Sequence, residues 1–123
     1  GSGELVGTYE KVSMALAQDD LKGAKEAATT LSCYAACHDN AALGAEADKI
    51  ANAASLEDAR AAFKMVSAKV IEDAGETADY FVMTCPRAKA DWIQTTKQVA
   101  NPYYGSQMLR CGAVKKTVMA KME

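Results

Sequence analysis

The sequence lacks any long apolar run and any surplus of basic residues. No stretch of its 123 residues approaches the ~20 consecutive apolar residues of a membrane-spanning helix, so we expect no membrane insertion. Lys and Arg number 14 against 16 Asp and Glu, which gives a net charge of −2. Without a basic block, nucleic acid is not expected as the main partner.

Residues for common catalytic sites are also scarce. His38 is the only histidine, so neither a multi-histidine metal site nor a Ser-His-Asp triad can form without it. The sequence contains no glycine-rich phosphate loop. Acidic residues such as Asp19, Asp20, Glu57 and Asp58 fit helix caps and first turns better than a catalytic carboxylate pair. We therefore expect a protein that is not an enzyme.

The composition is that of one ordinary globular domain. Half of the residues are apolar and 24% are charged, which argues against disorder. A chain of this length buries enough surface for a core of its own. Residues 1–3 are interpreted as a cloning remnant, and we expect a single domain over residues 4–123.

Residues 4–75 carry the apolar periodicity of four amphipathic helices. Apolar residues recur there at spacings of three and four, which places them on one face of each helix. In the second helix this stripe consists of Leu21, Ala24, Ala28, Leu31 and Ala35. Ser55 precedes an acidic first turn, as a helix N-cap does, and Gly75 is a suitable stop. Short connections between these segments predict an antiparallel, up-and-down helical bundle.

Residues 76–123 differ from the helical region in composition and lack its apolar periodicity. Residues 80–84 are aromatic and β-branched, which predicts a short strand that ends at Pro86. Residues 91–100 and 114–122 give no clear preference. The whole chain is therefore predicted to be mainly α, with a small irregular C-terminal cap that contains one short strand.

The C-terminal region also carries a recognisable pattern. It consists of Cys85-Pro86, Trp92-Ile93, Asn101-Pro102-Tyr103-Tyr104-Gly105, Met108 and Cys111-Gly112. This pattern resembles a small exported bacterial domain of unknown function that also occurs joined to periplasmic adaptor (membrane-fusion) subunits of copper/silver efflux systems. Residues 15–21 resemble the opening helices of that domain, so the resemblance spans nearly the whole chain and is specific over residues 80–118.

The resemblance implies a periplasmic or otherwise exported domain linked to the handling of soft heavy metals, with no established enzymatic activity. It places one cysteine at the position of Cys85 and one at that of Cys111. Members of the family commonly have methionine directly after Cys-Pro, whereas this chain has Arg87. That difference removes one candidate thioether ligand from the pattern.

Cys85 and Cys111 admit two interpretations. A disulfide between them would close the intervening loop and contribute ~3 kcal/mol through chain entropy. Alternatively, the two thiolates and Met83 or Met108 would form a Cu(I) site, since soft ligands select this ion. The usual behaviour of exported cysteine pairs favours the disulfide. Met14, Met65 and Met119 are expected to fill gaps in the core.

Cys33 and Cys37 are the stronger metal candidates. At i and i+4 they share one side of a helix, roughly opposite its apolar stripe, where structural cysteines would not be expected. Two thiolates suit Cu(I), and His38 is the candidate third ligand. Zinc would require more ligands than this stretch supplies.

Two alternatives remain for the same stretch. Cys33 and Cys37 could form disulfides with Cys85 and Cys111, which would attach the C-terminal region to the bundle. The sequence C-x-x-x-C-H is also one residue longer than the attachment motif of haem c, with His38 as the proximal ligand.

We therefore expect an exported copper-binding module, with Cu(I) as its ion and a periplasmic efflux or copper-transfer protein as a possible partner. A disulfide-stapled interaction domain without metal is the second hypothesis, and a c-type haem protein is the third. If the C-terminal region folds over the second helix, Cys85, Cys111, Met83 and Met108 would complete the site of Cys33 and Cys37.

Overall fold

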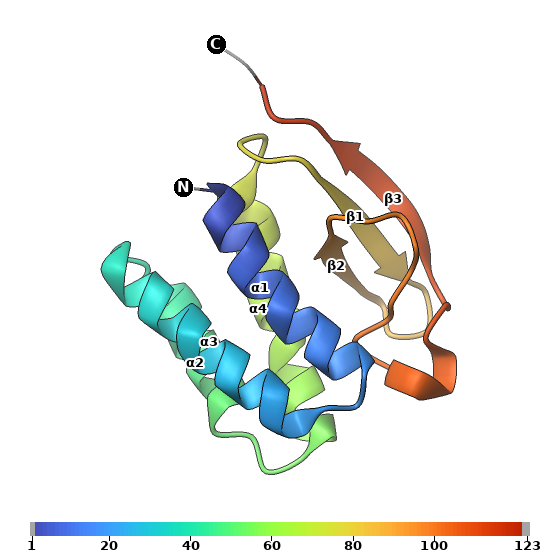
Figure 1. Ribbon diagram of the computed structural model, residues 1–123, viewed down its shortest axis with the longest axis horizontal. Coiled ribbons are helices and arrows are strands. Elements are labelled where there is room, and N and C mark those ends of the chain that lie inside the picture. The colour runs from blue at the N-terminus through green and yellow to red at the C-terminus, as the bar shows by residue number, and fades with distance from the viewer. Residues whose placement is uncertain (1, 122–123) are drawn as a thin grey trace.

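The computed structural model describes residues 2–121, which form four α-helices, three strands and one 3-10 helix (Figure 1). The helices are α1 (Ser2–Ala17), α2 (Leu21–Cys37), α3 (Ala41–Ala51) and α4 (Leu56–Ala74). The strands are β1 (Tyr80–Cys85), β2 (Ala90–Gln94) and β3 (Ala113–Val118), and the 3-10 helix η1 (Gly105–Met108) precedes β3. The protein is mainly α, as predicted. Helix α1 begins within the residues that were set aside as a cloning remnant.

Local capping accounts for the starts of α2, α3 and α4 and for the end of α4. The side chains of Asp20, Asn40 and Ser55 accept hydrogen bonds from backbone N–H groups in the first turns of α2, α3 and α4. Gly75 ends α4 with φ +49°, a conformation that glycine adopts without a steric penalty. The predicted caps at Asp20, Ser55 and Gly75 are therefore confirmed.

The helices and the sheet form successive layers. Each helix packs on the next one along the chain, α1 and α2 also contact α4, and β2 packs on α4 and α1. In Figure 1, α2 and α3 lie on one side of α1 and α4, and the sheet lies on the other side. The middle layer of α1 and α4 therefore separates α2 from the strands.

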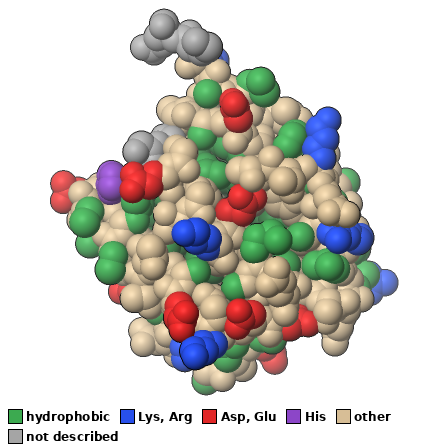
Figure 2. All heavy atoms as spheres, in the orientation of Figure 1, with side chains coloured by type: hydrophobic (Ala, Val, Ile, Leu, Met, Phe, Trp, Pro, Cys, Tyr) green, Lys and Arg blue, Asp and Glu red, His purple; other side chains and the backbone are tan. Residues whose placement is uncertain are grey.

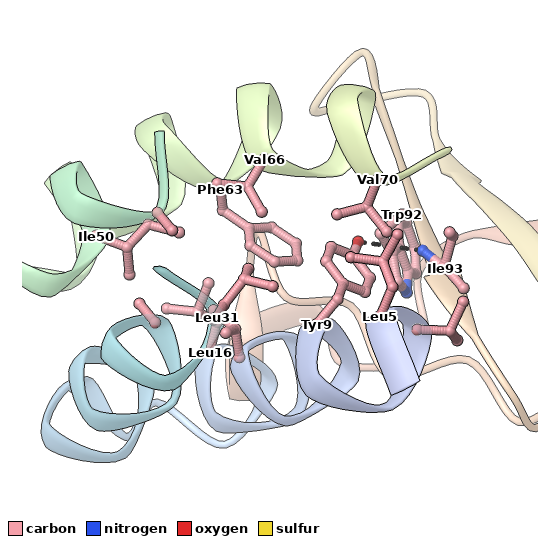
Figure 3. Packing of buried hydrophobic residues seen from close by; sticks show 14 of the residues in the cluster. Leu5, Tyr9, Leu16, Leu31, Ile50, Phe63, Val66, Val70, Trp92 and Ile93 are labelled. Carbon is pink, nitrogen blue, oxygen red and sulfur yellow. Dashed lines mark hydrogen bonds between the residues drawn. The ribbon is translucent and has the colours of Figure 1, made fainter. Parts of the chain in front are cut away.

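The core continues from the helices into the sheet through aromatic side chains (Figure 3). The rings of Tyr9 and Phe63 stack with centroids 5.2 Å apart, and the ring of Tyr103 lies 5.6 Å from that of Phe63. The hydroxyl of Tyr9 hydrogen-bonds to that of Ser67 at 2.7 Å and accepts the backbone N–H of Ile93 at 3.2 Å. Burial raises the pKa of the phenols of Tyr9 and Tyr103, so both remain neutral hydrogen-bonding groups.

The C-terminal region is more regular than predicted. Strand β1 matches the predicted strand, but it is the centre of a three-stranded antiparallel sheet in the order β2-β1-β3. Met83 pairs with Trp92 on β2 and with Val114 on β3. Strands β2 and β3 lie almost entirely within residues 91–100 and 114–122, for which no clear preference was predicted. Each is five or six residues long and becomes a strand by pairing with β1, which local sequence does not reveal.

Two buried amides hold the loop between β2 and β3. The side-chain amide of Gln94 donates to the carbonyls of Thr96 and Gln98, and its oxygen accepts the indole N–H of Trp92. Asn101 donates to the carbonyl of Cys111 at 2.8 Å, and its side-chain oxygen accepts the backbone N–H groups of residues 103 and 104. The Asn-Pro-Tyr-Tyr-Gly pattern therefore has a structural role: it folds this loop.

Asp19 is not a helix cap, contrary to the expectation from the sequence. It adopts φ +59° two residues after the end of α1 and forms an ion pair with Arg60 at 2.7 Å. Its carboxylate also accepts hydrogen bonds from the backbone and hydroxyl of Ser106. Arg60 in turn donates to the carbonyls of Leu16 and Pro102. This cluster ties α1, α4 and η1 together, which requires tertiary proximity that the sequence pattern did not indicate.

The burial of the methionines also differs from the prediction. Met14, Met65 and Met119 are 38%, 53% and 68% exposed, so they do not fill gaps in the core. Met83 is fully buried instead, at the centre of β1. Over residues 2–121, no helix combines the length and the apolar character needed to cross a membrane.

Candidate functional site

The thiols of Cys33 and Cys37 lie on the outer surface of α2. Both residues are exposed, whereas Ala24, Ala28, Leu31 and Ala35 of the same helix are completely buried. The predicted placement of the cysteine pair away from the apolar stripe is thus confirmed. At i and i+4, their Cβ atoms are about 5–6 Å apart on one face of the helix, so one ion can lie between the two sulfurs.

His38 ends α2 directly after this pair. Its ring stacks on that of Tyr34 with centroids 3.9 Å apart, and its Nδ1 lies 2.8 Å from the carbonyl oxygen of Tyr34. A carbonyl only accepts hydrogen bonds, so Nδ1 is the donor, and in the neutral form of the ring Nε2 is the nitrogen with a free lone pair. In the view of Figure 2, the histidine is at the edge of the molecule with acidic side chains on either side.

The residues of this end of α2 are not gathered into a larger metal cluster. Among residues 2–121, no three His, Cys, Asp or Glu side chains are grouped closely enough to hold a metal ion. The ring of His38 is held against Tyr34 rather than between the two thiols. Helix α2 therefore presents two exposed thiols one turn apart, followed by a histidine whose ring is held against Tyr34.

Cys85 occupies a different environment at the end of β1. It is completely buried, and its sulfur accepts the backbone N–H of Ala88 at 3.4 Å in the turn between β1 and β2. Met83, two residues earlier, is also completely buried. Both sulfurs are therefore part of the packing between the sheet and the helices, where an ion from solvent has no direct access.

Cys111 and Met108 lie at the other end of the loop and are half-buried. The carbonyl of Cys111 accepts the hydrogen bond from Asn101, and its N–H donates to the carbonyl of Met108. The strand register pairs Thr84 with Ala113, which brings the backbone of Cys111 near the end of β1. Cys85 and Cys111 thus belong to one part of the fold.

The structure does not bring the two cysteine pairs together. The C-terminal region folds over α4 and α1, not over α2, so the middle helix layer separates Cys33 and Cys37 from Cys85 and Cys111 (Figure 1). All four cysteines are free thiols. The prediction of disulfides that attach the C-terminal region to α2 is therefore wrong for this structure, because the helix packing places the partners on opposite sides of α1 and α4.

The hypothesis of a haem protein meets a steric constraint. The space between the helices is filled by Tyr9, Phe63, Leu31 and Leu43, all of which are completely buried. A haem attached through Cys33 and Cys37 would consequently lie on the exposed face of α2, outside the core.

One group of charged residues is not apparent from the sequence. Arg60 and Lys64 of α4 lie beside Arg87 and Lys89 of the β1–β2 turn and Lys115 of β3 around two surface hollows. These residues lie between positions 60 and 115 on three separate elements, so no local run of charge in the sequence indicates them. Periodicity on α4 was the available signal, since Arg60 and Lys64 are four residues apart on one helix face.

Comparison with known proteins does not indicate a function for these residues. No protein-family model, no curated protein and no solved structure matches the chain.

Proposed function

We propose that this protein is a Cu(I)-binding module that holds the ion between the thiolates of Cys33 and Cys37 and has no enzymatic role. The observation that carries the proposal is the exposure of both thiols on the outward face of α2, opposite its buried stripe. Structural cysteines are normally buried. Two thiols held side by side in solvent are instead suited to bind a soft ion.

The ligand chemistry favours Cu(I) over other ions. Soft thiolates select Cu(I), which is satisfied by two or three ligands. Zinc prefers four ligands in a tetrahedral arrangement, and α2 supplies only two thiols and one imidazole. Cys33 and Cys37 are thus the essential ligands in this proposal.

His38 is the proposed third ligand. Metal-binding histidines usually donate their second N–H to a carbonyl or a carboxylate, which fixes the tautomer and the ring orientation. The Nδ1–H of His38 already has such an acceptor in the carbonyl of Tyr34. Binding would require the ring to leave Tyr34 or the ion to lie toward Nε2, so the contribution of His38 is expected to be smaller than that of either thiolate.

The biological setting of the proposal comes from the resemblance to the exported domain of copper/silver efflux adaptors. On that basis we place the protein in the periplasm or another exported location, with an efflux or copper-transfer protein as its partner. We also treat the four helices as an up-and-down bundle with the sheet as its C-terminal cap. An ion held on the outside of α2 is accessible to such a partner.

The test is a titration of the reduced protein with Cu(I) against a competing chelator. We expect Cys33→Ser/Cys37→Ser to weaken Cu(I) binding at least about 100-fold, which is more than an outer-shell change would cause. His38→Gln should weaken it about tenfold. Cys111→Ser is the control and should bind as the unmodified protein does. Affinity should also fall as pH decreases, because the thiols must lose protons to bind.

Equal stoichiometry and affinity in the unmodified protein and in the double cysteine variant would overturn the proposal. In that case a loss of binding in Cys111→Ser would assign the ion to Cys85 and Cys111. Circular dichroism of each variant checks that the helices are retained.

A further inference from the structure

A basic groove runs along α4 on the side that faces the sheet. It consists of two adjoining hollows of about 560 and 270 Å³, and Lys64 borders both of them. The turn between β1 and β2 forms the opposite wall with Arg87 and Lys89. Residues of α4, the β1–β2 turn and β3 therefore contribute to one continuous surface feature, which we call the basic groove.

The positive charge in this groove is largely uncompensated. Among the residues that the structure describes, Lys64, Arg87 and Lys89 have no ion-pair or hydrogen-bond partner for their side chains, and all three are exposed. Two further cations at the groove are neutralised, because Arg60 pairs with Asp19 and Lys115 pairs with Asp91. Three unpaired cations thus surround one groove on a protein whose net charge is −2.

The floor of the groove is made of small and apolar residues. Ala61, Ala68 and Ile71 lie along α4, and Ala88 and Ala90 lie on the opposite wall. Alanine side chains leave room for another backbone to approach closely. The groove therefore offers apolar contact at its base and positive charge at its rim.

The length of the groove suits an extended peptide. From Arg60 to Ile71, α4 rises roughly 16 Å at 1.5 Å per residue, which matches about five residues of extended chain. We propose that the basic groove binds an extended, acidic peptide segment of a partner protein. Carboxylates of the segment would pair with Lys64, Arg87 and Lys89, and its apolar side chains would cover the alanines.

A peptide fits these observations better than a nucleic acid does. A sugar-phosphate backbone would gain little from the apolar floor, and the acidic residue Asp91 lines the groove. The net negative charge of the protein would also oppose a long polyanion. A peptide presents carboxylates and apolar side chains together, which satisfies both the rim and the floor.

This inference does not depend on the copper proposal. The thiols of Cys33 and Cys37 project from α2, whereas the groove lies where α4 meets the sheet, on the other side of the middle helix layer. The two surfaces can therefore be tested and can fail separately.

Fluorescence anisotropy with a labelled ten-residue peptide of alternating Glu and Ala tests the inference at low ionic strength. We expect the unmodified protein to bind this peptide and Lys64→Glu/Arg87→Glu to bind it at least about tenfold more weakly, as expected for the loss of two exposed charge pairs. The matched control is Lys11→Glu/Lys22→Glu, which makes the same change of charge on α1 and α2. Its binding should stay within about twofold of the unmodified protein after allowance for net charge.

A second variant distinguishes binding in the groove from non-specific attraction of the peptide to the charged surface. Ala68→Gln fills the floor without changing the net charge, and we expect it to weaken peptide binding several-fold. Unchanged binding in Ala68→Gln, an equal loss in the Lys11/Lys22 control, or no binding by the unmodified protein would overturn the inference. Tighter binding of a single-stranded oligonucleotide of equal charge would also overturn it and would assign the groove to nucleic acid.

Discussion

The helical region and the C-terminal sheet of this protein are stabilised in different ways. Helices α1 to α4 are defined by apolar stripes and local caps, such as Asn40 at the start of α3. The sheet has short strands, and the loop that completes it is held by the buried amides of Gln94 and Asn101. Removing one of these amides leaves several buried backbone groups without a hydrogen-bond partner, whereas removing an exposed helix cap leaves its backbone group accessible to water.

The largest difference is expected between two asparagine substitutions. Asn101→Ala removes three hydrogen bonds to backbone groups of residues 103, 104 and 111, and leaves those groups without partners. We expect it to lower the free energy of unfolding by about 3–4 kcal/mol. Asn40→Ala removes the cap of α3 and should cost only about 1 kcal/mol. Urea denaturation followed by circular dichroism measures both.

Equal losses in the two asparagine variants would contradict this comparison. It would mean that the loop before β3 contributes no more to stability than an ordinary helix cap. Tryptophan fluorescence offers a local readout, because Trp92 is the only tryptophan and packs against Tyr103 with ring centroids 5.9 Å apart.

A pair of glycine substitutions should change stability in opposite directions. A Cβ on Gly112 would lie 2.9 Å from the ring of Trp92 and 3.0 Å from the carbonyl of Thr84, at φ +144°. We therefore expect Gly112→Ala to cost about 2 kcal/mol or more. Gly44 lies within α3, and a Cβ there would meet Ala35 at an ordinary 3.7 Å. Gly44→Ala should stabilise the protein by about 0.5–1 kcal/mol.

The midpoint of thermal unfolding is sufficient to test the glycine pair. A loss of stability in Gly44→Ala would show that α2 and α3 cannot accommodate the additional methyl group. An unchanged midpoint in Gly112→Ala would show that the chain before β3 can move away from Trp92.

The smallest effect on stability is expected at the junction between the two regions, the cluster of Asp19, Arg60 and Ser106. Hydrogen bonds from Ser106 and the ion pair with Arg60 lower the pKa of Asp19 below its ordinary value of 3.8. A lowered pKa in the folded state gives stability that is present above pH 4 and is lost as pH falls through the folded pKa. The stability difference between the unmodified protein and Asp19→Asn should therefore shrink between pH 5 and pH 2.

Urea midpoints across that pH range test the role of Asp19, with Asp58→Asn as the control for an exposed acidic residue in the first turn of α4. A difference that stays constant with pH would show that the charge of Asp19 does not contribute to the junction.

Part of the candidate site could be predicted from the sequence for the same reason as the helices. The spacing of Cys33 and Cys37 relative to the stripe of Leu31 and Ala35 is a local property of one helix, and their exposure follows from it. The relation of these thiols to Cys85 is not local. It depends on which helices the sheet covers, and the sequence left that choice open.

The sequence by itself determined the four helices, their caps at Asp20 and Ser55, and the outward face of α2. These features follow from contacts within one or two helical turns, which a periodic pattern encodes directly. Tertiary structure alone decided the pairing of β2 and β3 with β1, the cluster of Asp19 with Arg60, and the basic groove. Each of these joins residues that are far apart in the chain, and their proximity results from the packing of the sheet on α4 and α1.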